Sequence, residues 1–317
     1  MRSLVTGGAG FIGSNLADAL LERGDEVTVI DDLSTGRREN LAGALERGTE
    51  LVEADIADAE AVGEVVAGHR PEAVFHLAAQ MDVRRSVLDP GFDARVNVVG
   101  TANVLEAVRR DAPGAALVFA STGGAIYGEG EGRDLPFGED SPLAPEAPYG
   151  QSKLAGEGYV GFYRRMHGLA GVSLRLGNVY GPRQDPLGEA GVVAIFCGRL
   201  RDGGCPTIFG DGRQTRDFVY VGDVVAAMLA AAERLDGGAS GVGEVYNVGT
   251  GRETTVLELA ETLASIGGRD DFDPELAPAR AGEIQRCAID PGKAGADLGW
   301  HAATGVDEGL RITLEGV

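Results

Sequence analysis

The sequence predicts an α/β protein: a doubly wound parallel sheet with a smaller C-terminal α/β part. Three observations predict it. Strand and helix signals alternate over the first 176 residues, a glycine-rich turn joins the first strand to the first helix, and the chain beyond Gly177 is richer in glycine and proline. Such alternation is typical of a parallel sheet with helices on both faces.

The composition excludes several classes of protein. With 317 residues, 44% of them hydrophobic, the chain can form one large or two modest domains. A net charge of −21 argues against binding to nucleic acid or an anionic membrane. No apolar run is long enough to span a membrane, and the first strand begins at once, so we expect no signal peptide. Three cysteines without metal-ligand spacing predict reduced thiols, a cytoplasmic location and no metal site.

The first unit of the fold is a strand, a glycine-rich turn, a helix and a second strand. These parts lie at Ser3–Thr6, Gly7–Gly13, Ser14–Arg23 and Glu26–Ile30, and Asp31 and Asp32 follow. A glycine motif in this context indicates a dinucleotide site.

Each glycine of the turn has a physical role. Gly7 permits the tight turn, Gly10 lets backbone approach a pyrophosphate, and Gly13 lets the helix pack on the strand. Free N–H groups at the start of the helix favour phosphates. Asp31 lies 18 residues after Gly13, near the spacing of the carboxylate that holds an adenosine ribose and repels a 2′-phosphate. We therefore expect NAD, although two nearby arginines leave NADP open.

The alternation continues up to residue 176. The predicted strands are Leu51–Asp55, Ala73–Leu77, Ala116–Ser121 and Gly171–Leu176, and the predicted helices are Asp93–Arg110 and Tyr149–Met166. Ligands of such sheets lie at the carboxyl ends of the strands. Asp55 and Ile56 are therefore placed to meet an adenine.

Beyond Gly177 we predict a smaller part that binds the substrate and is interleaved with the first. Its expected strands are Thr207–Phe209, Arg216–Tyr220 and Val245–Asn247, and a flexible surface loop is expected at Gly237–Gly243. The predicted domains are 1–176, a Rossmann-like NAD-binding domain to which about 216–248 returns, and 177–317 for the substrate.

Tyr149 and Lys153 are a candidate acid/base pair. The chain has only two lysines, the other being Lys293, and uses arginine elsewhere as its cation. In a helix, residues four apart share one face. A lysine ammonium beside a phenol favours its ionised form, so this tyrosine could exchange protons near neutral pH.

These motifs resemble those of the extended short-chain dehydrogenase/reductase family over nearly the whole chain. The matching segments are Thr6–Gly13, His76–Ala79, Asn97, Tyr149 with Lys153, Gly177–Pro182 and Arg216–Phe218. Within the family, the chain is most similar to enzymes that epimerise UDP-sugars at C4. The resemblance implies interconversion of UDP-galactose and UDP-glucose by transient oxidation at C4, with no net oxidation.

The resemblance also implies roles for single residues. NAD would be held permanently, Tyr149 would take the proton of the sugar 4′-OH, and Lys153 would hold the nicotinamide ribose. The cofactor-binding residues expected from the glycine unit and the resemblance together are Gly7, Gly10, Phe11, Ile12, Asp31, Asp32, Asp55, Ile56, Leu77, Ala78, Ala79, Asn97, Tyr149 and Lys153.

A second implied set binds the UDP. Asn178, Arg216 and Arg280 match residues that meet the diphosphate, where forked donors suit pairs of oxygens. Phe209 lies in the strand that packs on the uracil. Glu283 stands where the family usually has an aspartate that faces a ribose.

The chain departs from the family at Gly123. Many members have a serine or threonine there that bonds the sugar 4′-OH. We expect Thr122, or else Ser121, to take this role. Dehydratases and decarboxylases of the family have acids after that hydroxyl, whereas Gly123 and Gly124 supply none, so epimerisation is favoured over both.

Cys287 aligns with a position that lines the sugar pocket. Its small side chain leaves room for an N-acetyl group, so interconversion of UDP-GlcNAc and UDP-GalNAc is a second expected activity. The plain alternative is a buried packing residue, as free cysteines often are.

Two other functions remain open. One is 4-epimerisation of UDP-glucuronate or a UDP-pentose, although no cation for a sugar carboxylate is evident in the sequence. The other is a non-catalytic NAD-binding regulator, which the retained Tyr149 and Lys153 disfavour. The resemblance further implies a homodimer formed by a four-helix bundle, with the helices around 97–110 and 149–166 as candidates.

Overall fold

The computed structural model describes residues 1–186, 191–236, 244–269, 272–280 and 283–316. The loop expected at Gly237–Gly243 lies outside the described residues.

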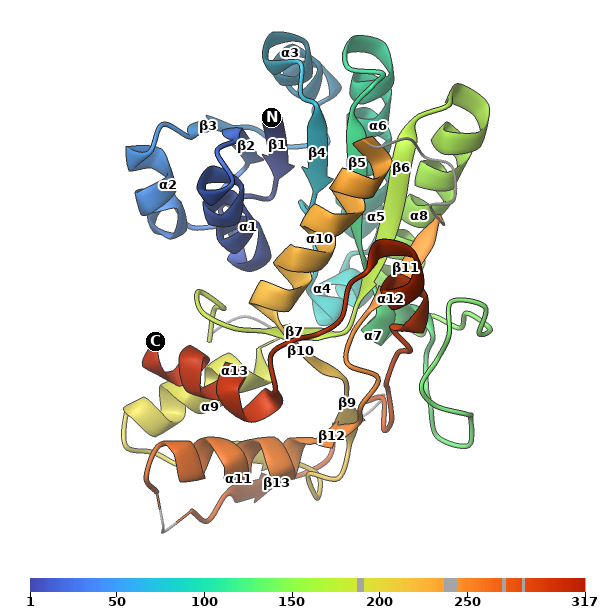
Figure 1. Ribbon diagram of the computed structural model, residues 1–317. Coiled ribbons are helices and arrows are strands. Elements are labelled where there is room, and N and C mark those ends of the chain that lie inside the picture. Colours follow the sequence, from blue (N-terminus) through green and yellow to red (C-terminus); the bar gives the residue numbers. More distant parts are fainter. Residues whose placement is uncertain (187–190, 237–243, 270–271, 281–282, 317) are drawn as a thin grey trace.

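A seven-stranded sheet forms the larger part of the molecule (Figure 1). Its order is β11-β6-β5-β4-β1-β2-β3, and all neighbouring strands are parallel. The order reverses between β1 and β4, which confirms the predicted doubly wound sheet. The strands are β1 (Arg2–Thr6), β2 (Glu26–Asp31), β3 (Glu50–Glu53), β4 (Ala73–His76), β5 (Ala116–Thr122), β6 (Ala170–Leu176) and β11 (Val245–Val248).

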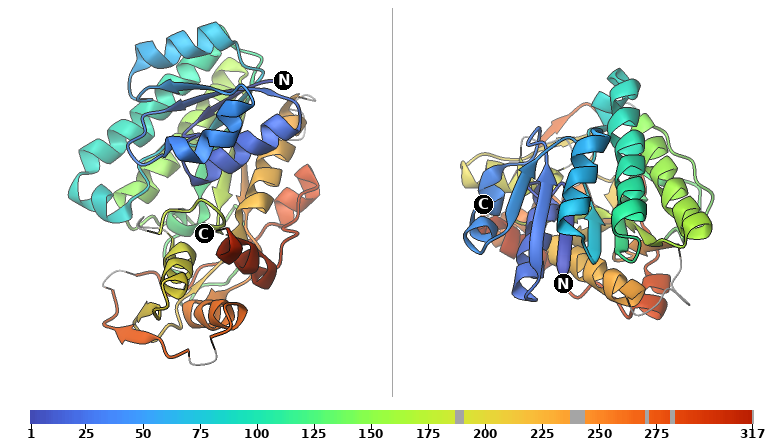
Figure 2. Two further views of the ribbon diagram at one scale, coloured as in Figure 1. Left: turned by 90° about the vertical axis from the view of Figure 1, so that its left-hand side faces the viewer. Right: turned by 90° about the horizontal axis from the view of Figure 1, so that it is seen from above.

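Helices cover both faces of the sheet (Figure 2). One face packs against α1 (Phe11–Glu22), α10 (Val221–Asp236) and α12 (Gly292–Leu298), and the other against α3 (Ala59–His69), α6 (Gly100–Asp111) and α8 (Pro148–His167). Because both faces are buried, the central strands are nearly continuous apolar runs. Shorter helices are η1 (Arg38–Leu41), α2 (Ala42–Glu46), α4 (Val83–Leu88), α5 (Pro90–Ala94), η2 (Arg95–Val99) and α7 (Gly123–Ile126).

The helix predicted at 93–110 differs in detail. It comprises α5, the π-helical segment η2 and α6. Asn97 lies in η2, where its side chain accepts a hydrogen bond from the N–H of Gln80 at 2.8 Å and donates one to the carbonyl of Gln80 at 2.8 Å. Tertiary bonds of this kind stabilise the widened turn, which helical periodicity does not predict.

A second, smaller part lies beyond the carboxyl ends of the strands (Figure 1). It has its own apolar core, to which α9, α11 and α13 contribute. Its helices are α9 (Val192–Arg201), α11 (Val256–Ile266) and α13 (Val306–Glu315). Its strands pair as β7 (Asn178–Tyr180) with β10 (Phe218–Tyr220), β9 (Thr215–Arg216) with β12 (Thr254–Thr255), and β8 (Thr207–Phe209) with β13 (Glu275–Ala277).

The strand predicted at 216–220 is broken at Asp217. The buried carboxylate of Asp217 accepts hydrogen bonds from the backbone N–H groups of Thr250, Gly251 and Ile289, at 2.8, 3.0 and 3.2 Å. The side chain therefore ties three distant segments together, and β9 and β10 join different sheets on either side of it.

Among the described residues, no helix is both long and apolar enough to cross a membrane.

Candidate functional site

The glycine turn packs closely against neighbouring backbone and leads into an uncapped start of α1. Gly7 has φ +73°, and a Cβ there would lie 2.6 Å from the backbone nitrogen of Ala78. A Cβ on Gly13 would collide with the carbonyl oxygen of Gly7. Gly10 caps α1 without a side-chain hydrogen bond, so the first N–H groups of the helix, from Phe11 and Ile12 onward, have no side-chain cap. This is the geometry that favours a phosphate.

Asp31 lies directly beneath this turn, at the end of β2. Its two oxygens accept hydrogen bonds from the N–H groups of Ala9 and Leu33, each at 2.9 Å. Burial raises the pKa of the Asp31 carboxyl. Asp32 is exposed and bonds Ser34. The first acid therefore holds the turn in shape, and both lie at the carboxyl edge of the sheet.

The expected adenine residues follow β3. Asp55 forms an ion pair with Arg95 at 3.2 Å. Ile56 is buried against Gly100, where an added Cβ would come within 2.6 Å of its Cδ1. Leu77 to Ala79 follow β4 directly, and the N–H of Leu77 donates to the carbonyl of Thr6 at 3.1 Å. Leu77 to Ala79 thus lie where the strand order reverses, between β4 and β1, whereas Asp55 and Ile56 follow the edge strand β3.

A chain of hydrogen bonds joins the glycine turn to Asn97. The N–H of Ala78 donates to the hydroxyl oxygen of Thr6, and the hydroxyl of Thr101 donates to the carbonyl of Asn97. Since that proton is committed, Nε2 of His76 donates to Thr101 at 3.0 Å, and Nδ1 accepts from Thr6 at 2.7 Å. Burial lowers the pKa of His76 to about 3, so this imidazole is neutral.

Tyr149 and Lys153 lie in the first turns of α8, as predicted. Desolvation raises the pKa of Tyr149 to about 12, against a hydrogen bond from Thr122 that lowers it. Burial lowers the pKa of Lys153 to about 7, while the charges of Glu157 and Asp93 oppose this change. The Nζ atom of Lys153 lies 4.2 Å from the centre of the Phe119 ring. Burial therefore keeps the phenol of Tyr149 protonated near neutral pH, whereas the sequence predicted that Lys153 would favour its ionised form.

The two candidate hydroxyls have different partners. Thr122 lies near enough to Tyr149 for its hydroxyl to lower the pKa of the phenol, whereas the hydroxyl of Ser121 donates to Oε1 of Glu157 at 2.6 Å. A Cβ on Gly123 would lie 2.7 Å from Cδ1 of Ile289. Ile289 therefore fills the space in which a family serine would stand, and Thr122 is the hydroxyl beside the phenol.

The sequence did not reveal the polar network behind this pair. Glu157 and Arg175 form a buried ion pair at 2.8 Å, and Arg175 also donates to the hydroxyl of Tyr127 at 2.8 Å. That hydroxyl donates to Asn247, in β11. The spacing of Glu157, four residues after Lys153, was a usable signal, but its partner Arg175 lies in a strand, β6.

The residues expected to bind UDP gather at the edge of the smaller part. Arg216 lies 3.6 Å from the carboxylate of Glu283, and burial lowers the pKa of the Arg216 guanidinium. The guanidinium of Arg280 lies 3.9 Å from the ring centre of Phe209. The backbone N–H of Asn178 donates to the carbonyl of Asp217 at 2.7 Å, which places Asn178 beside Arg216.

Cys287 is buried beside Gly123. Its Sγ lies 3.9 Å from the carbonyl oxygen of Gly123, and burial raises the pKa of the thiol to about 11. The structure thus brings Cys287 and Gly123 together.

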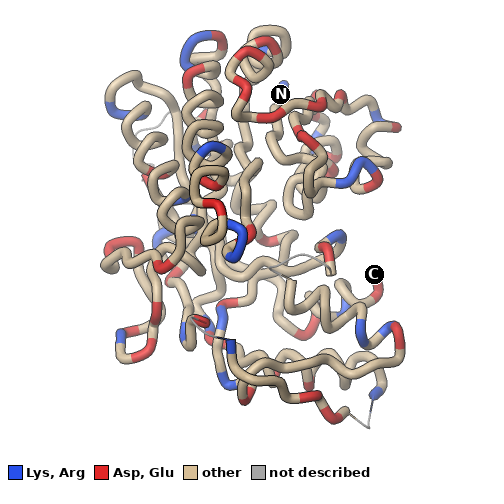
Figure 3. Tube along the Cα trace, turned by 180° about the vertical axis from the view of Figure 1, so that it is seen from behind, with Lys and Arg blue, Asp and Glu red and all other residues tan. Residues whose placement is uncertain are grey.

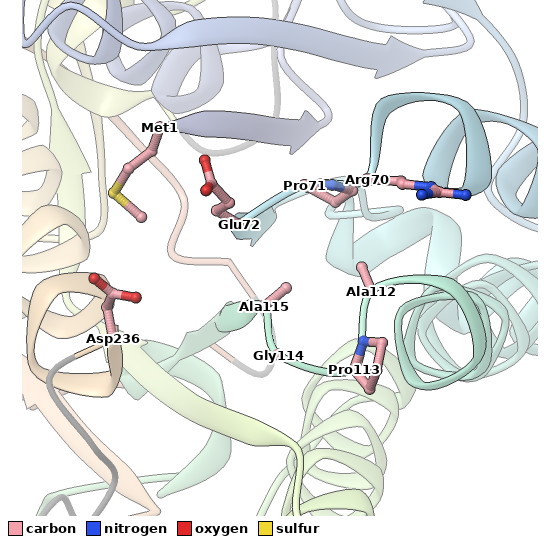
Figure 4. Close-up of a pocket in the computed structure, with 9 residues that line it drawn as sticks. All are labelled: Met1, Arg70, Pro71, Glu72, Ala112, Pro113, Gly114, Ala115 and Asp236. Carbon is pink, nitrogen blue, oxygen red and sulfur yellow. The ribbon is translucent and has the colours of Figure 1, made fainter.

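One surface hollow lies elsewhere (Figure 4). It measures about 360 Å³ and is lined by the amino ends of β1 and β4 and by the turn before β5, with Met1, Glu72 and Ala115 among its residues. Ligands of doubly wound sheets bind at the opposite, carboxyl edge. No group of residues with metal-ligand geometry occurs in the described part of the chain.

Known proteins resemble the chain over its full length. The model of the NAD dependent epimerase/dehydratase family matches residues 3–249. A UDP-glucose 4-epimerase of Mycolicibacterium smegmatis is 48% identical over 99% of this chain and 98% of its own. The structure of the UDP-glucose 4-epimerase of Thermotoga maritima with UDP-glucose is 45% identical and superimposes with a TM-score of 0.92, covering 100% of this chain and 98% of that one. The enzyme of Thermus thermophilus in complex with NAD is also 45% identical, with the same coverage and a TM-score of 0.88.

Proposed function

Because the chain belongs to the NAD-dependent epimerase/dehydratase family, we propose that it is a UDP-glucose 4-epimerase that interconverts UDP-galactose and UDP-glucose. The single observation that carries the proposal is the placement of Thr122, Tyr149 and Lys153 together at the carboxyl edge of the sheet, with no acid at Gly123 or Gly124. Two relatives that align over nearly their full length support it: the UDP-glucose 4-epimerase of Mycolicibacterium smegmatis, 48% identical, and a putative UDP-glucose 4-epimerase of Methanocaldococcus jannaschii, 44% identical.

The residues of the first unit fit NAD. An added Cβ at Gly7 or Gly13 would collide with the protein's own backbone, so this tight turn requires glycine there, and the uncapped start of α1 suits a pyrophosphate. Asp31 and Asp32 suit a ribose hydroxyl and repel a 2′-phosphate. When bound, NAD supplies a reversible acceptor for the hydride of the sugar C4.

The chain's own residues would move the proton. Tyr149, in its ionised form, takes the proton of the 4′-OH as C4 is oxidised, and returns it when the 4-keto sugar is reduced on its other face. Thr122 donates a hydrogen bond to the phenol oxygen and so stabilises its anion. The positive charge of Lys153 offsets part of the free-energy cost of desolvating that anion. Proton and hydride are both returned, so no net oxidation results.

Arg216, Arg280 and Asn178 are proposed to hold the diphosphate. The guanidinium of Arg216 lies 3.6 Å from the carboxylate of Glu283. This is a loose ion pair, so phosphate oxygens can replace the carboxylate as the partner of Arg216. Arg280 stacks on Phe209, so the same pair can bind a uracil on one side and a phosphate on the other. Glu283 is then free to bind a ribose hydroxyl.

The two parts of the chain are proposed to divide this work. Residues 1–176, with about 216–248, would hold the cofactor, and the remainder of 177–317 would hold the nucleotide. The return of β11 to the main sheet and the separate core around α9, α11 and α13 support this division.

A wider substrate range is part of the proposal. The thiol of Cys287 beside Gly123 leaves more space near the sugar than a tyrosine would, which supports activity on UDP-GlcNAc. UDP-glucuronate and UDP-pentoses are not favoured.

The proposed assembly is a homodimer formed through α8 and its neighbours. Exposed apolar side chains cluster on α4 and α8, namely Val83, Val87, Leu88, Tyr159, Phe162 and Met166. Because α4 packs against α8, these side chains are close enough to form one patch, which a second copy would cover. The proposed location is the cytoplasm, which the free thiols of the three cysteines support.

The test is incubation of the purified protein, without added NAD, with UDP-galactose, UDP-GlcNAc or UDP-glucuronate, with each product resolved by NMR. We expect UDP-glucose from the first tube, UDP-GalNAc from the second and no change in the third. Tyr149→Phe is the matched control, since it removes only the titrating hydroxyl. No conversion in any tube after addition of NAD contradicts the proposal.

A further inference from the structure

The segment that follows β7 returns to α1. Nδ2 of Asn15 on α1 donates hydrogen bonds to the carbonyl of Phe11 at 2.9 Å and to the carbonyl of Pro182 at 3.2 Å. Arg183 forms an ion pair with Asp18 of α1 at 2.5 Å, and its backbone has φ +71°, which is uncommon for a residue with a side chain. The segment therefore lies against the first two turns of α1, next to the expected pyrophosphate.

A second ion pair ties the same segment to the loop after β2. The guanidinium of Arg37 lies 2.9 Å from Oδ2 of Asp185, although the two residues are 148 positions apart in the sequence. The backbone N–H of Arg37 donates to the carbonyl of Ala9, in the glycine turn, at 3.0 Å. Arg37 is thus fixed to the glycine turn by its backbone and reaches Asp185 with its side chain.

Arg37 starts beside the carboxylate that is expected to face the adenosine ribose. A Cβ on Gly36, the preceding residue, would lie 2.7 Å from Oδ1 of Asp31. In folds of this kind the carboxylate after the second strand binds the ribose 2′-OH, whereas an arginine near it accommodates the 2′-phosphate of NADP. Arg37 has the charge and the place for that second task.

The partner of Arg37 opposes this use. The guanidinium already binds a carboxylate, and a phosphate that approached it would also approach the negative charge of Asp185. Asp32, which is exposed and bonds Ser34, adds a further negative charge after β2. The side chains of Arg37 and Asp185 are 55% and 39% exposed, so their ion pair adds little to stability. Its main effect is on what Arg37 can bind.

We propose that Asp185 is a specificity-determining residue that excludes NADP by holding the guanidinium of Arg37. Asp31 selects the ribose hydroxyl, and Asp185 occupies the cation that would otherwise bind a phosphate. Because Asp185 follows β7, where the chain enters the smaller part, both parts of the molecule take part in the choice of cofactor. The inference rests on the proposed function only for the site of NAD and is independent of which sugar is epimerised.

A competition between the two cofactors tests the proposal. The purified protein is warmed with deuterium-labelled NAD and a large excess of NADP until labelled NAD has replaced the resident NAD. Unbound nucleotide is then removed by gel filtration, and the bound nucleotides are released and quantified by mass spectrometry. With Asp185→Asn we expect the ratio of bound NAD to bound NADP to fall about tenfold, because Arg37 becomes available to the 2′-phosphate. An unchanged ratio overturns the proposal.

Two further variants separate this mechanism from a general effect of charge. Asp18→Asn removes a carboxylate from the other ion pair of the same segment, and it is expected to leave the ratio unchanged. In an Arg37→Gln background, Asp185→Asn is expected to change the ratio much less than in the parent protein. Equal changes in the two backgrounds overturn the proposal, because Asp185 would then act without Arg37.

The ratio compares two ligands of the same protein, so a loss of stability cannot by itself produce the expected change. The side chains of Asp185 and Asp18 are 39% and 28% exposed, and both variants are expected to fold. Arg38 is present in every variant and therefore cannot cause a difference between them. The measurement quantifies bound cofactor and needs no turnover, so its result stands apart from the test with UDP-galactose.

Discussion

Two neighbouring hydroxyls at the end of β5 have different partners and therefore different effects. Thr122 faces the phenol of Tyr149, whereas Ser121 completes the buried pair of Glu157 and Arg175. The first can alter the energy of a developing phenolate, and the second can alter only the position of α8 against the sheet. Substitutions at the two sites should therefore affect different quantities.

Thr122→Val keeps the shape of the side chain and removes its hydroxyl. We expect kcat to fall about 10- to 100-fold, which corresponds to the loss of one hydrogen bond of roughly 1–3 kcal/mol to a charged oxygen. Ser121→Ala is the matched variant and is expected to lower Tm with a smaller effect on kcat. Steady-state kinetics and calorimetry on both proteins decide, and the reverse pattern would assign the catalytic hydroxyl to Ser121.

The sequence predicts those parts of the candidate site that depend on neighbours in the chain. The glycines of residues 7–13 and the spacing of Tyr149 and Lys153 are local, and their elements are found where expected. The packing of Ile289 into the space at Gly123, and the buried charges of Glu157 and Arg175, depend on contacts between distant segments. Such contacts leave no periodic signal in one sequence.

At the scale of elements, α8 has two proposed functions. Its inner face carries Lys153 and Glu157, and its outer face carries exposed Tyr159, Phe162 and Met166. Close packing of Gly156 on the ring of Phe119 brings the helix near the sheet, since an added Cβ would lie 2.6 Å from that ring. One helix therefore joins the proposed catalytic pair to the proposed dimer contact.

Phe162→Glu is expected to turn the proposed dimer into a monomer, because it buries a charge in the patch. Leu276→Glu is the matched control: it changes an exposed apolar residue of β13, outside the patch, in the same way. Light scattering after gel filtration gives the mass of each protein. A monomeric parent protein, or a dimeric Phe162→Glu variant, contradicts the proposed interface.

Element types were predictable where a hydrophobic period is sustained, as in the strands of the main sheet and in α1 and α8. The exceptions lie where a side chain bonds distant backbone. Asn97 widens the helix at η2, and Asp217 interrupts the strand at 216–220. In both places hydrogen bonds between a polar side chain and distant backbone outweigh the hydrophobic pattern, so the boundary of the element could not be derived from hydrophobicity.

At the scale of the whole molecule, negative charge dominates. The net charge is −21, and Figure 3 shows acidic residues over both parts of the chain. Like charges at such density repel one another and oppose the compact state, whereas salt at about 0.1–0.15 M screens the repulsion between charges more than about 8–10 Å apart. The buried pair of Glu157 and Arg175 is shielded from that effect, so the salt dependence should arise from the surface.

Added sodium chloride is therefore expected to raise Tm at neutral pH. An increase of about 1 kcal/mol in the free energy of unfolding corresponds to a rise in Tm of roughly 2–4 °C for a chain of about this size. Near pH 4.5, the isoelectric point, the net charge vanishes and the same salt should have little effect on Tm. Calorimetry across a salt series at both pH values measures this, and equal responses at the two would exclude surface repulsion as the cause.

The position of β11 limits how the protein can be truncated. This strand comes late in the chain, yet it pairs with β6 and covers what would otherwise be an open edge. A fragment ending at Leu176 would expose that edge together with the apolar surface that α10 covers. Unpaired edges and bare apolar faces promote aggregation. The cofactor-binding part therefore cannot be expressed alone by simple truncation, and a soluble version would have to carry residues 216–248 on a new linker.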